Sequence, residues 1–476
     1  MSNLKREACL IGGEWVTGEH WIDVDNPATG AVIGRVPRFG RVETERAIAA
    51  ADEAMGPWAR QTAKERARIL RRYHDLIMAN QEELAALLTQ EQGKPLSEAR
   101  GEIAYAAGFI EWFAEEAKRV YGDVIPSHAP DKRIVVLKQP IGVVAAITPW
   151  NFPAAMITRK IGPALAAGCG VVVKPASQTP FTALALGALA QEAGLPPGLL
   201  NVVTGSATEI GGALTASETV RKLSFTGSTE IGAKLYAQSA PTIKKLSLEL
   251  GGNAPFIVFD DADLDAAVVG ALQSKFRNAG QTCVCAIRIY AQAGIHDAFV
   301  ERLVAATAKL KVGAGSEPGT EIGPLIDDKA LAKVREHIGD ATAKGARVLT
   351  GGEAHALGGR YFTPTVLTGV TSEMLVSREE TFGPLAPVFR FQDEDEVIAQ
   401  ANATPFGLAA YFYARDIGRI WRVAERIEAG IVGVNTGLIS TELAPFGGIK
   451  ASGLGREGSK YGLDDYLEIK YLCLGL

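Results

Sequence analysis

The spacing of apolar residues predicts a helical segment followed by alternating strands and helices. Between residues 40 and 120, apolar side chains recur every three or four positions with charges between them, as in amphipathic helices. After Pro140 the apolar runs become short, and helical stretches separate them. The expected strands are VVAAIT, GVVVKP, LLNVVTG, RKLSFTG and KKLSLELGG, and the expected helices are 153–168, 180–194, 208–217 and 229–240. This alternation predicts parallel βαβ units and therefore an open α/β sheet.

A second alternation begins at Asn253 and predicts a second α/β domain. Its expected strands are APFIVF, CAIRIYAQ, YFTPTVL, LAPVFRF, LAAYFYA and GIVGVNT, and its expected helices are 263–278, 393–402 and 416–429. Two pieces fit neither domain: residues 120–140, which are expected to form a β-hairpin, and the C-terminal strand within 462–476. Strands without a sheet of their own suggest β-pairing between subunits, so we expect a homo-oligomer, either a dimer or a dimer of dimers.

Composition and charge exclude several classes of protein. The 476 residues are 47% hydrophobic and 22% charged, which is ordinary for a soluble globular protein. The net charge of −5 argues against a nucleic-acid binder. The longest uncharged stretch, 139–158, contains three prolines, so no membrane span is expected. The apolar run at the N-terminus is too short for a signal peptide, and a cytoplasmic location is expected.

The cysteines raise a question of chemistry. There are five, an odd number, so a disulfide scaffold is not expected. Cys283 and Cys285 lie two residues apart, which is compatible with a metal clip, a disulfide, or a nucleophile with a neighbour. No two of the six histidines are close in sequence, so no metal site is expected.

Two expected strands end in residues that suit a phosphate-bearing ligand. The strand at Phe225 runs into Gly227 and Ser228, where a helix N-terminus can bind a diphosphate or can simply be capped. The usual G-x-G-x-x-G fingerprint is absent. A second strand ends at Lys174, which places a cation at the binding edge of the sheet or is a surface lysine.

Seven motifs occur in order along the chain: TPWNFP, KPAS, FTGSTEIG, LELGGN, GQTC, EETFGPL and PFGGIKASGLGRE. Together they resemble the NAD(P)-dependent aldehyde dehydrogenase superfamily over nearly the whole sequence. The resemblance implies a Rossmann-like cofactor-binding domain (1–119 and 141–251), an α/β catalytic domain (252–446) and a small β oligomerisation arm (120–140 and 462–476). A non-catalytic structural protein on the same scaffold is the alternative from another functional class.

The resemblance also implies roles for residues of the active site. Cys283 matches the nucleophile, which attacks the aldehyde and later carries a thioester. Asn151, with the Cys283 backbone N–H, matches the donor pair for the oxyanion. Glu249 matches the general base for thioester hydrolysis, at a position where burial would raise its pKa.

The implied cofactor is NADP, with NAD possible. Glu380 matches the carboxylate that holds the nicotinamide ribose, and the other cofactor-binding positions are Trp150, Lys174, Ser177, Gly227, Ser228 and Phe382. Members that prefer NAD often carry Glu at the position of Ser177. Serine does not repel a 2′-phosphate, and Lys174 is near enough in sequence to pair with it.

Four further stretches, MITRK, GQTCVCAIR, FGLAAYFYARD and GLIS, resemble the succinate-semialdehyde dehydrogenase branch. That branch oxidises a short aldehyde with a distal carboxylate, in 4-aminobutyrate degradation. We expect Arg159 and Arg288 to clamp this carboxylate, together with the hydroxyl of Ser440. Glutarate semialdehyde, one methylene longer, is the alternative small-molecule substrate, because one methylene gives little discrimination.

Cys285 has two interpretations. It can be an apolar packing residue. It can also capture an oxidised Cys283 in a strained, easily reduced disulfide, which would inactivate the enzyme reversibly.

Overall fold

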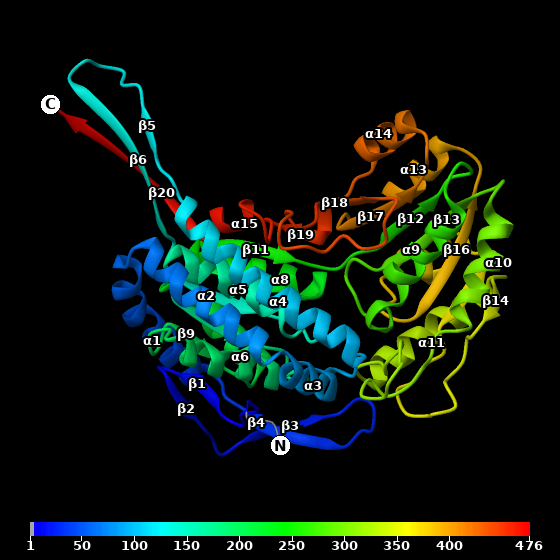
Figure 1. The fold of residues 1–476 in the computed structure, drawn as a ribbon, viewed down its shortest axis with the longest axis horizontal. Helices are drawn as coiled ribbons and strands as arrows, with labels where there is room; N and C mark the ends of the chain where they lie inside the picture. The colour runs from blue at the N-terminus through cyan, green and yellow to red at the C-terminus, as the bar shows by residue number, and fades with distance from the viewer. Residues whose placement is uncertain (1–3) are drawn as a thin grey trace.

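The computed structural model describes residues 4–476 as two α/β lobes and a projecting arm (Figure 1). The first lobe is built on an eight-stranded sheet in the order β19-β11-β10-β7-β8-β9-β1-β2. Its five central strands are parallel, and β1, β2 and β19 are antiparallel additions at the two sides. The strands are β1 (Cys9–Ile11), β2 (Glu14–Val16), β7 (Val143–Ile147), β8 (Val171–Lys174), β9 (Leu200–Val202), β10 (Val220–Thr226), β11 (Lys245–Glu249) and β19 (Gly453–Leu454). The expected strands of this lobe are all present, whereas β1, β2 and β19 were not predicted.

Helices cover both faces of this sheet. They are α1 (Arg41–Arg60), α2 (Ala63–Ala79), α3 (Gln81–Gln92), α4 (Leu96–Glu116), α5 (Ala155–Ala167), α6 (Pro180–Ala193), α7 (Ala207–Ala216) and α8 (Thr229–Ser239). A separate two-stranded sheet joins β3 (Trp21–Asp25) to β4 (Val32–Pro37).

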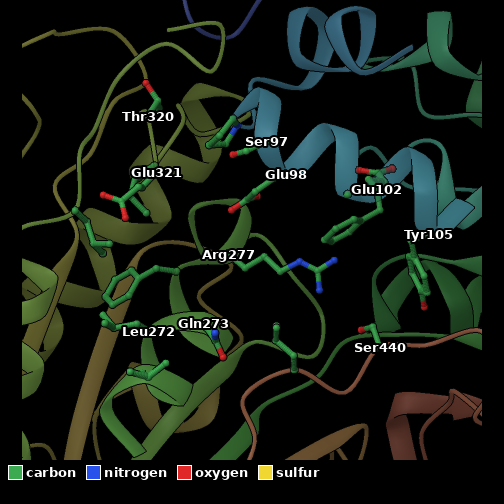
Figure 2. Close-up of a pocket in the computed structure, with 18 residues that line it drawn as sticks. Ser97, Glu98, Glu102, Tyr105, Leu272, Gln273, Arg277, Thr320, Glu321 and Ser440 are labelled. Carbon is green, nitrogen blue, oxygen red and sulfur yellow. The ribbon is translucent and has the colours of Figure 1, made fainter. Parts of the chain in front are cut away.

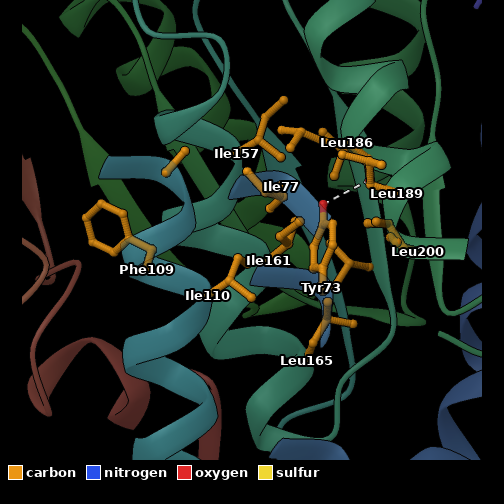
Figure 3. Packing of buried hydrophobic residues seen from close by; sticks show 14 of the residues in the cluster. Tyr73, Ile77, Phe109, Ile110, Ile157, Ile161, Leu165, Leu186, Leu189 and Leu200 are labelled. Carbon is orange, nitrogen blue, oxygen red and sulfur yellow. Dashed lines mark hydrogen bonds between the residues drawn. The ribbon is translucent and has the colours of Figure 1, made fainter. Parts of the chain in front are cut away.

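Helix α5 lies at the centre of the largest apolar cluster, where it contacts α2 and α4 (Figure 3). Every residue of α5 is buried, including Arg159 and Lys160. Nearby, the Tyr73 hydroxyl donates to the carbonyl of Leu186 at 3.0 Å, which satisfies its polar end inside the core. A fully buried helix directly after the PWNFP turn gives that turn a rigid support.

The second lobe is built on a seven-stranded sheet in the order β14-β15-β16-β13-β12-β17-β18. All pairs are parallel except β14–β15. The strands are β12 (Ala254–Val258), β13 (Ala286–Gln292), β14 (Arg347–Thr350), β15 (Thr365–Thr368), β16 (Leu385–Phe391), β17 (Ala409–Tyr413) and β18 (Ile431–Val434). The helices are α9 (Leu264–Phe276), α10 (His296–Thr307), α11 (Asp328–Ala343), α12 (Leu375–Arg378), α13 (Glu394–Asn402) and α14 (Ile417–Arg426).

The arm is a three-stranded antiparallel sheet that projects from the first lobe (Figure 1). It consists of β5 (Asp123–Ile125), β6 (Lys132–Pro140) and β20 (Leu467–Gly475). Strand β20 follows the short helix α15 (Tyr461–Asp464) and pairs with β6 from Leu467 opposite Pro140 to Gly475 opposite Lys132. The predicted α/β architecture of two lobes and a β arm is therefore confirmed.

No helix within residues 4–476 is long and apolar enough to cross a membrane.

Candidate active site

The carboxyl ends of β7, β10 and β11 meet at a cavity of about 240 Å³. This is the edge at which ligands of an open α/β sheet are bound. The second lobe supplies Cys283, from the turn before β13, and the loop after α12. The cavity is lined by Pro149, Trp150, Asn151, Met156, Thr226, Gly227, Ser228, Leu250, Gly251, Cys283, Glu380 and Phe382.

Cys283 and Glu249 form a thiol–carboxylate pair at this cavity. The Cys283 Sγ lies 3.9 Å from the Glu249 Oε2. Glu249 is the last residue of β11, and burial raises the pKa of its carboxyl group to about 8. Burial and the nearby Glu249 and Glu380 carboxylates raise the pKa of the Cys283 thiol well above its usual value. Both shifts favour the protonated forms near neutral pH, so the ionised fraction of Glu249 is the species that can accept a proton beside the sulfur.

Asn151 presents an amide donor beside the nucleophile. Its Nδ2 donates to the carbonyl of Gln281 at 3.0 Å, which uses one of its two N–H groups. Within the described chain, the backbone N–H of Cys283 donates to no protein acceptor. Two donors are therefore available at the edge of one cavity, which is the requirement for binding an oxyanion.

The same cavity includes the N-terminus of a helix. Helix α8 begins directly after Gly227 and Ser228, and the Ser228 hydroxyl accepts from the N–H of Ile231 at 3.4 Å. A side chain at position 227 would collide with the Phe225 ring, because its Cβ would lie 2.4 Å from a ring carbon. Close packing against this ring therefore requires glycine at the start of α8, and the role of this helix N-terminus toward a phosphate stays a prediction.

The loop after α12 provides a carboxylate and an aromatic ring. Burial raises the pKa of Glu380 to about 7, and its Oε1 accepts from the N–H of Gly252 at 3.2 Å. Phe382 packs edge-on against Trp150, with ring centroids 5.6 Å apart. Its φ of 54° lies in the left-handed region, where a bulky residue is strained. Such strain is typical of a residue held in place for a ligand.

Lys174 and Ser177 lie at the neighbouring strand end and do not line the cavity itself. The Lys174 ammonium is buried and donates to the carbonyl of Pro175 at 2.9 Å. Burial lowers the pKa of Lys174 to about 8. Ser177 is half-buried. Their roles toward a 2′-phosphate remain predictions.

A second, larger cavity of about 630 Å³ is drawn in Figure 2. Phe152, which lines it, directly follows Asn151, which lines the first cavity. Ser440 lines it, as does Arg277, which sequence reasoning did not select. The Arg277 side chain extends toward the side where Tyr105 and Ser440 lie. Its guanidinium lies 4.9 Å from the centre of the Phe152 ring and donates to no acceptor within residues 4–476. Arg277 is thus a cation with free donors in the larger cavity, six residues before Cys283 in the sequence, and its charge acts on the neighbouring Glu98 carboxyl group.

The prediction for Arg288 is wrong. Its guanidinium carries five N–H donors, and the structure shows five hydrogen bonds. Two go to the carbonyl of Asn253, and the others go to the carbonyls of Gln400 and Ala401 and to the Tyr290 hydroxyl. The side chain is 1% exposed and lines neither cavity. No donor remains for a substrate carboxylate, so Arg288 ties β13 to the end of α13.

Arg159 is only partly engaged by protein partners. Its Nε lies 2.7 Å from the Glu457 Oε2, and its guanidinium lies 4.1 Å from the centre of the Phe446 ring. Its Nη2 is buried without a hydrogen-bond partner. The positive charge opposes the rise of the Glu249 pKa. A direct role in binding substrate stays a prediction.

Cys285 is buried and turned toward another partner. Its Sγ donates to the carbonyl of Lys275 at 3.2 Å, and both Cys283 and Cys285 are free thiols. The redox disulfide therefore stays a prediction that requires the Cys285 side chain to turn. No group of three or more His, Cys, Asp or Glu side chains that could hold a metal occurs among residues 4–476.

Comparison with known proteins agrees with this geometry. The glutarate-semialdehyde dehydrogenase of Pseudomonas aeruginosa is 67% identical over 100% of this chain and 99% of its own length. The NADP(+) succinate-semialdehyde dehydrogenase GabD of Escherichia coli (strain K12) is 66% identical, with the same coverage. A crystal structure described as an NADP dependent enzyme of E. coli superposes with a TM-score of 0.99 at 66% identity, over 100% of this chain and 99% of that one. The model of the aldehyde dehydrogenase family matches residues 15–472, and the chain belongs to this family.

Proposed function

We propose that this enzyme oxidises a short aldehyde bearing a distal carboxylate, with NADP as the oxidant. Succinate semialdehyde is the first candidate, and glutarate semialdehyde is the second. The observation that carries the proposal is the free Arg277 guanidinium, which lies with Ser440 in the larger cavity, whose lining residue Phe152 directly follows Asn151 of the Cys283 cavity. The names of the two relatives above, which are semialdehyde dehydrogenases, support the same substrate class.

The chemistry begins with Cys283. The Cys283 thiol loses its proton to solvent, and the resulting thiolate attacks the aldehyde carbon and forms a thiohemiacetal. The resulting oxyanion accepts hydrogen bonds from the Asn151 amide and the Cys283 N–H. Bound NADP would supply the two-electron oxidation of the thiohemiacetal.

The second half of the reaction is hydrolysis. Glu249 takes a proton from a water molecule, which attacks the thioester carbon; the acid leaves and the Cys283 thiol is restored. The buried carboxyl group suits this role, because a pKa of about 8 makes it a stronger base than an exposed glutamate.

Recognition of the far end of the substrate is assigned to Arg277 and Ser440. A guanidinium can bind a carboxylate through two parallel hydrogen bonds, and a hydroxyl can donate a third. The larger cavity of about 630 Å³ has room for either chain length, so we propose that both semialdehydes are accepted.

The cofactor residues are proposed on the same basis. Gly227 and Ser228 open the N-terminus of α8 to the diphosphate, and Glu380 accepts from the nicotinamide ribose hydroxyls. Lys174 and Ser177 accommodate the 2′-phosphate, since serine brings no negative charge to that place. NADP is therefore preferred over NAD.

The assembly and location are also part of the proposal. The arm exposes a row of apolar side chains, Val124, Ile125, Leu137, Ile469, Tyr471 and Leu474. Exposed strands with apolar side chains are suited to pairing with another subunit. We propose a homo-oligomer built through the arm, and a cytoplasmic location.

The test is a panel of C3 to C6 aldehydes, with and without a terminal carboxylate, assayed with NADP and with NAD. The expected result is the highest kcat/KM for succinate or glutarate semialdehyde with NADP. Equal kcat/KM values for the carboxylated and uncharged aldehydes would refute the proposal.

A further inference from the structure

Lys94 lies fully buried behind the Asn151 turn, and the reaction described above gives it no role. It falls between the end of α3 and the start of α4 and is 2% exposed. Its ammonium donates to the carbonyl oxygen of Asn151 at 2.8 Å and to the Glu102 Oε2 at 2.6 Å. It also lies 3.9 Å from the centre of the Phe152 ring. A buried charge is retained only where its partners hold it, so these contacts fix its position.

Glu102 extends the contact to the other side of the same turn. Its Oε1 accepts from the N–H of Ala154 at 2.9 Å and from the N–H of Ala155 at 3.3 Å. These groups open helix α5, which follows the turn directly. One buried ion pair therefore holds the turn at both ends, by its first carbonyl and by its last N–H groups.

Asn278 links this support to the nucleophile loop. Its Nδ2 donates to the same Asn151 carbonyl at 3.0 Å and to the carbonyl of Gln281 at 3.2 Å. The Gln281 carbonyl also accepts the Asn151 amide. Gln92 completes the connection, since its side chain contacts both Asn278 and the N–H of Lys94 at 3.0 Å. The oxyanion donor and the Cys283 loop are thus held in one hydrogen-bonded network.

We propose that Lys94 is a positioning residue, which acts with Glu102 to aim the Asn151 amide at the oxygen of the bound aldehyde. The inference rests on the proposed role of Asn151 in oxyanion binding. Position is the relevant property here, because the Glu102 carboxylate 2.6 Å away offsets the charge of the ammonium at the substrate. Small errors in the placement of an oxyanion donor are costly, because its strength depends on distance and angle.

The test is a double-mutant cycle of wild type, Lys94→Met, Asn151→Ala and the double variant. The rate of the first burst of NADPH is measured with succinate semialdehyde and normalised to titrated active sites. Lys94→Met is expected to slow the burst by about 10- to 100-fold, a part of the loss expected for removing an oxyanion donor. In the Asn151→Ala background the same change is expected to cost less than about twofold, because no amide remains to be misplaced. An equal loss in both backgrounds would overturn the proposal.

Lys222→Met is the matched control. Lys222 is an equally buried lysine of the same lobe, and its ammonium contacts Ser247 and lies 3.9 Å from Asp465. Both lysine variants are expected to lower the thermal midpoint of unfolding, but only Lys94→Met should slow the burst. The NADP Kd of Lys94→Met should be unchanged. An equally slow burst in Lys222→Met would mean that loss of a buried lysine acts through general destabilisation, and the proposal would fall.

A second variant tests the proposal if Lys94→Met does not fold. Lys94→Met/Glu102→Gln removes both charges and keeps an acceptor for the N–H groups of α5. It is expected to fold and to show the same slow burst; a normal burst rate would overturn the proposal. Failure of wild type to oxidise any semialdehyde would instead refute the proposed function, so the two failures are distinguishable.

Discussion

Hydrolysis of the thioester should follow the ionisation of Glu249. Its pKa is about 8, so only about 1% of the carboxyl group is ionised at pH 6, about 10% at pH 7 and about half at pH 8. Because the carboxylate is the active base, the rate rises with pH. The turnover rate after the burst should increase about 50-fold from pH 6 to pH 8 wherever hydrolysis limits turnover. A glutamate with an ordinary pKa would give a flat profile over this range.

Stopped-flow measurement of NADPH separates the two half-reactions. The burst reports formation of the thioester, and the slow phase reports its hydrolysis. Glu249→Gln should leave a burst close to one NADPH per active site and a slow phase that is reduced about 100-fold or more and no longer rises with pH. The glutamine keeps the shape of the side chain, so it is the matched substitution.

Two results would refute the reasoning. A slow phase in wild type that is flat between pH 6 and pH 8 would mean that Glu249 is not the titrating base. Loss of the burst in Glu249→Gln, together with loss of turnover, would mean that the carboxylate is essential before the thioester forms.

Three further predictions concern substrate, cofactor and redox state. Arg277→Ala should cost about 2–5 kcal/mol in kcat/KM for succinate semialdehyde and little for butanal, as for a buried charged contact; equal losses would make Arg277 structural. Ser177→Glu should shift the ratio of kcat/KM values from NADP toward NAD, because a carboxylate opposes the 2′-phosphate; an unchanged ratio would place the 2′-position elsewhere. After inactivation by peroxide, dithiothreitol should restore the activity of wild type but not that of Cys285→Ala, and mass spectrometry should find sulfinic or sulfonic acid on Cys283 of the variant. Equal recovery of activity would mean that Cys285 is a packing residue.

The sequence predicted most of the central strands because their signals are local. Apolar runs separated by helical stretches identified every parallel strand of the first sheet. Strand β19, Gly453–Leu454, has only two residues and joins β11 from a distant part of the chain, so no local pattern could reveal it. Strand β1 differs, because it pairs with β2 across the Gly12-Gly13 turn as well as with the distant β9; this local hairpin signal was overlooked.

The two arginines show where sequence reasoning about the site reached its limit. Arg277 and Arg288 are separated from Cys283 by similar numbers of residues in the sequence. Either arginine side chain is chemically able to clamp a carboxylate. Arg288 lies on β13, where the strand directs its side chain toward the carbonyls of Gln400 and Ala401. Arg277 precedes Asn278 and Ala279, both with positive φ, and this irregular turn leaves its guanidinium free in the cavity. The direction of each side chain depends on backbone geometry that spacing alone does not give.

The most direct measurement is mass spectrometry of Glu249→Gln quenched with acid during the slow phase, after mixing with succinate semialdehyde and NADP. One succinyl group should be found per subunit, on the peptide that contains Cys283, in an amount equal to the NADPH of the burst. NADPH formation with an unmodified Cys283 peptide would contradict covalent catalysis by this cysteine.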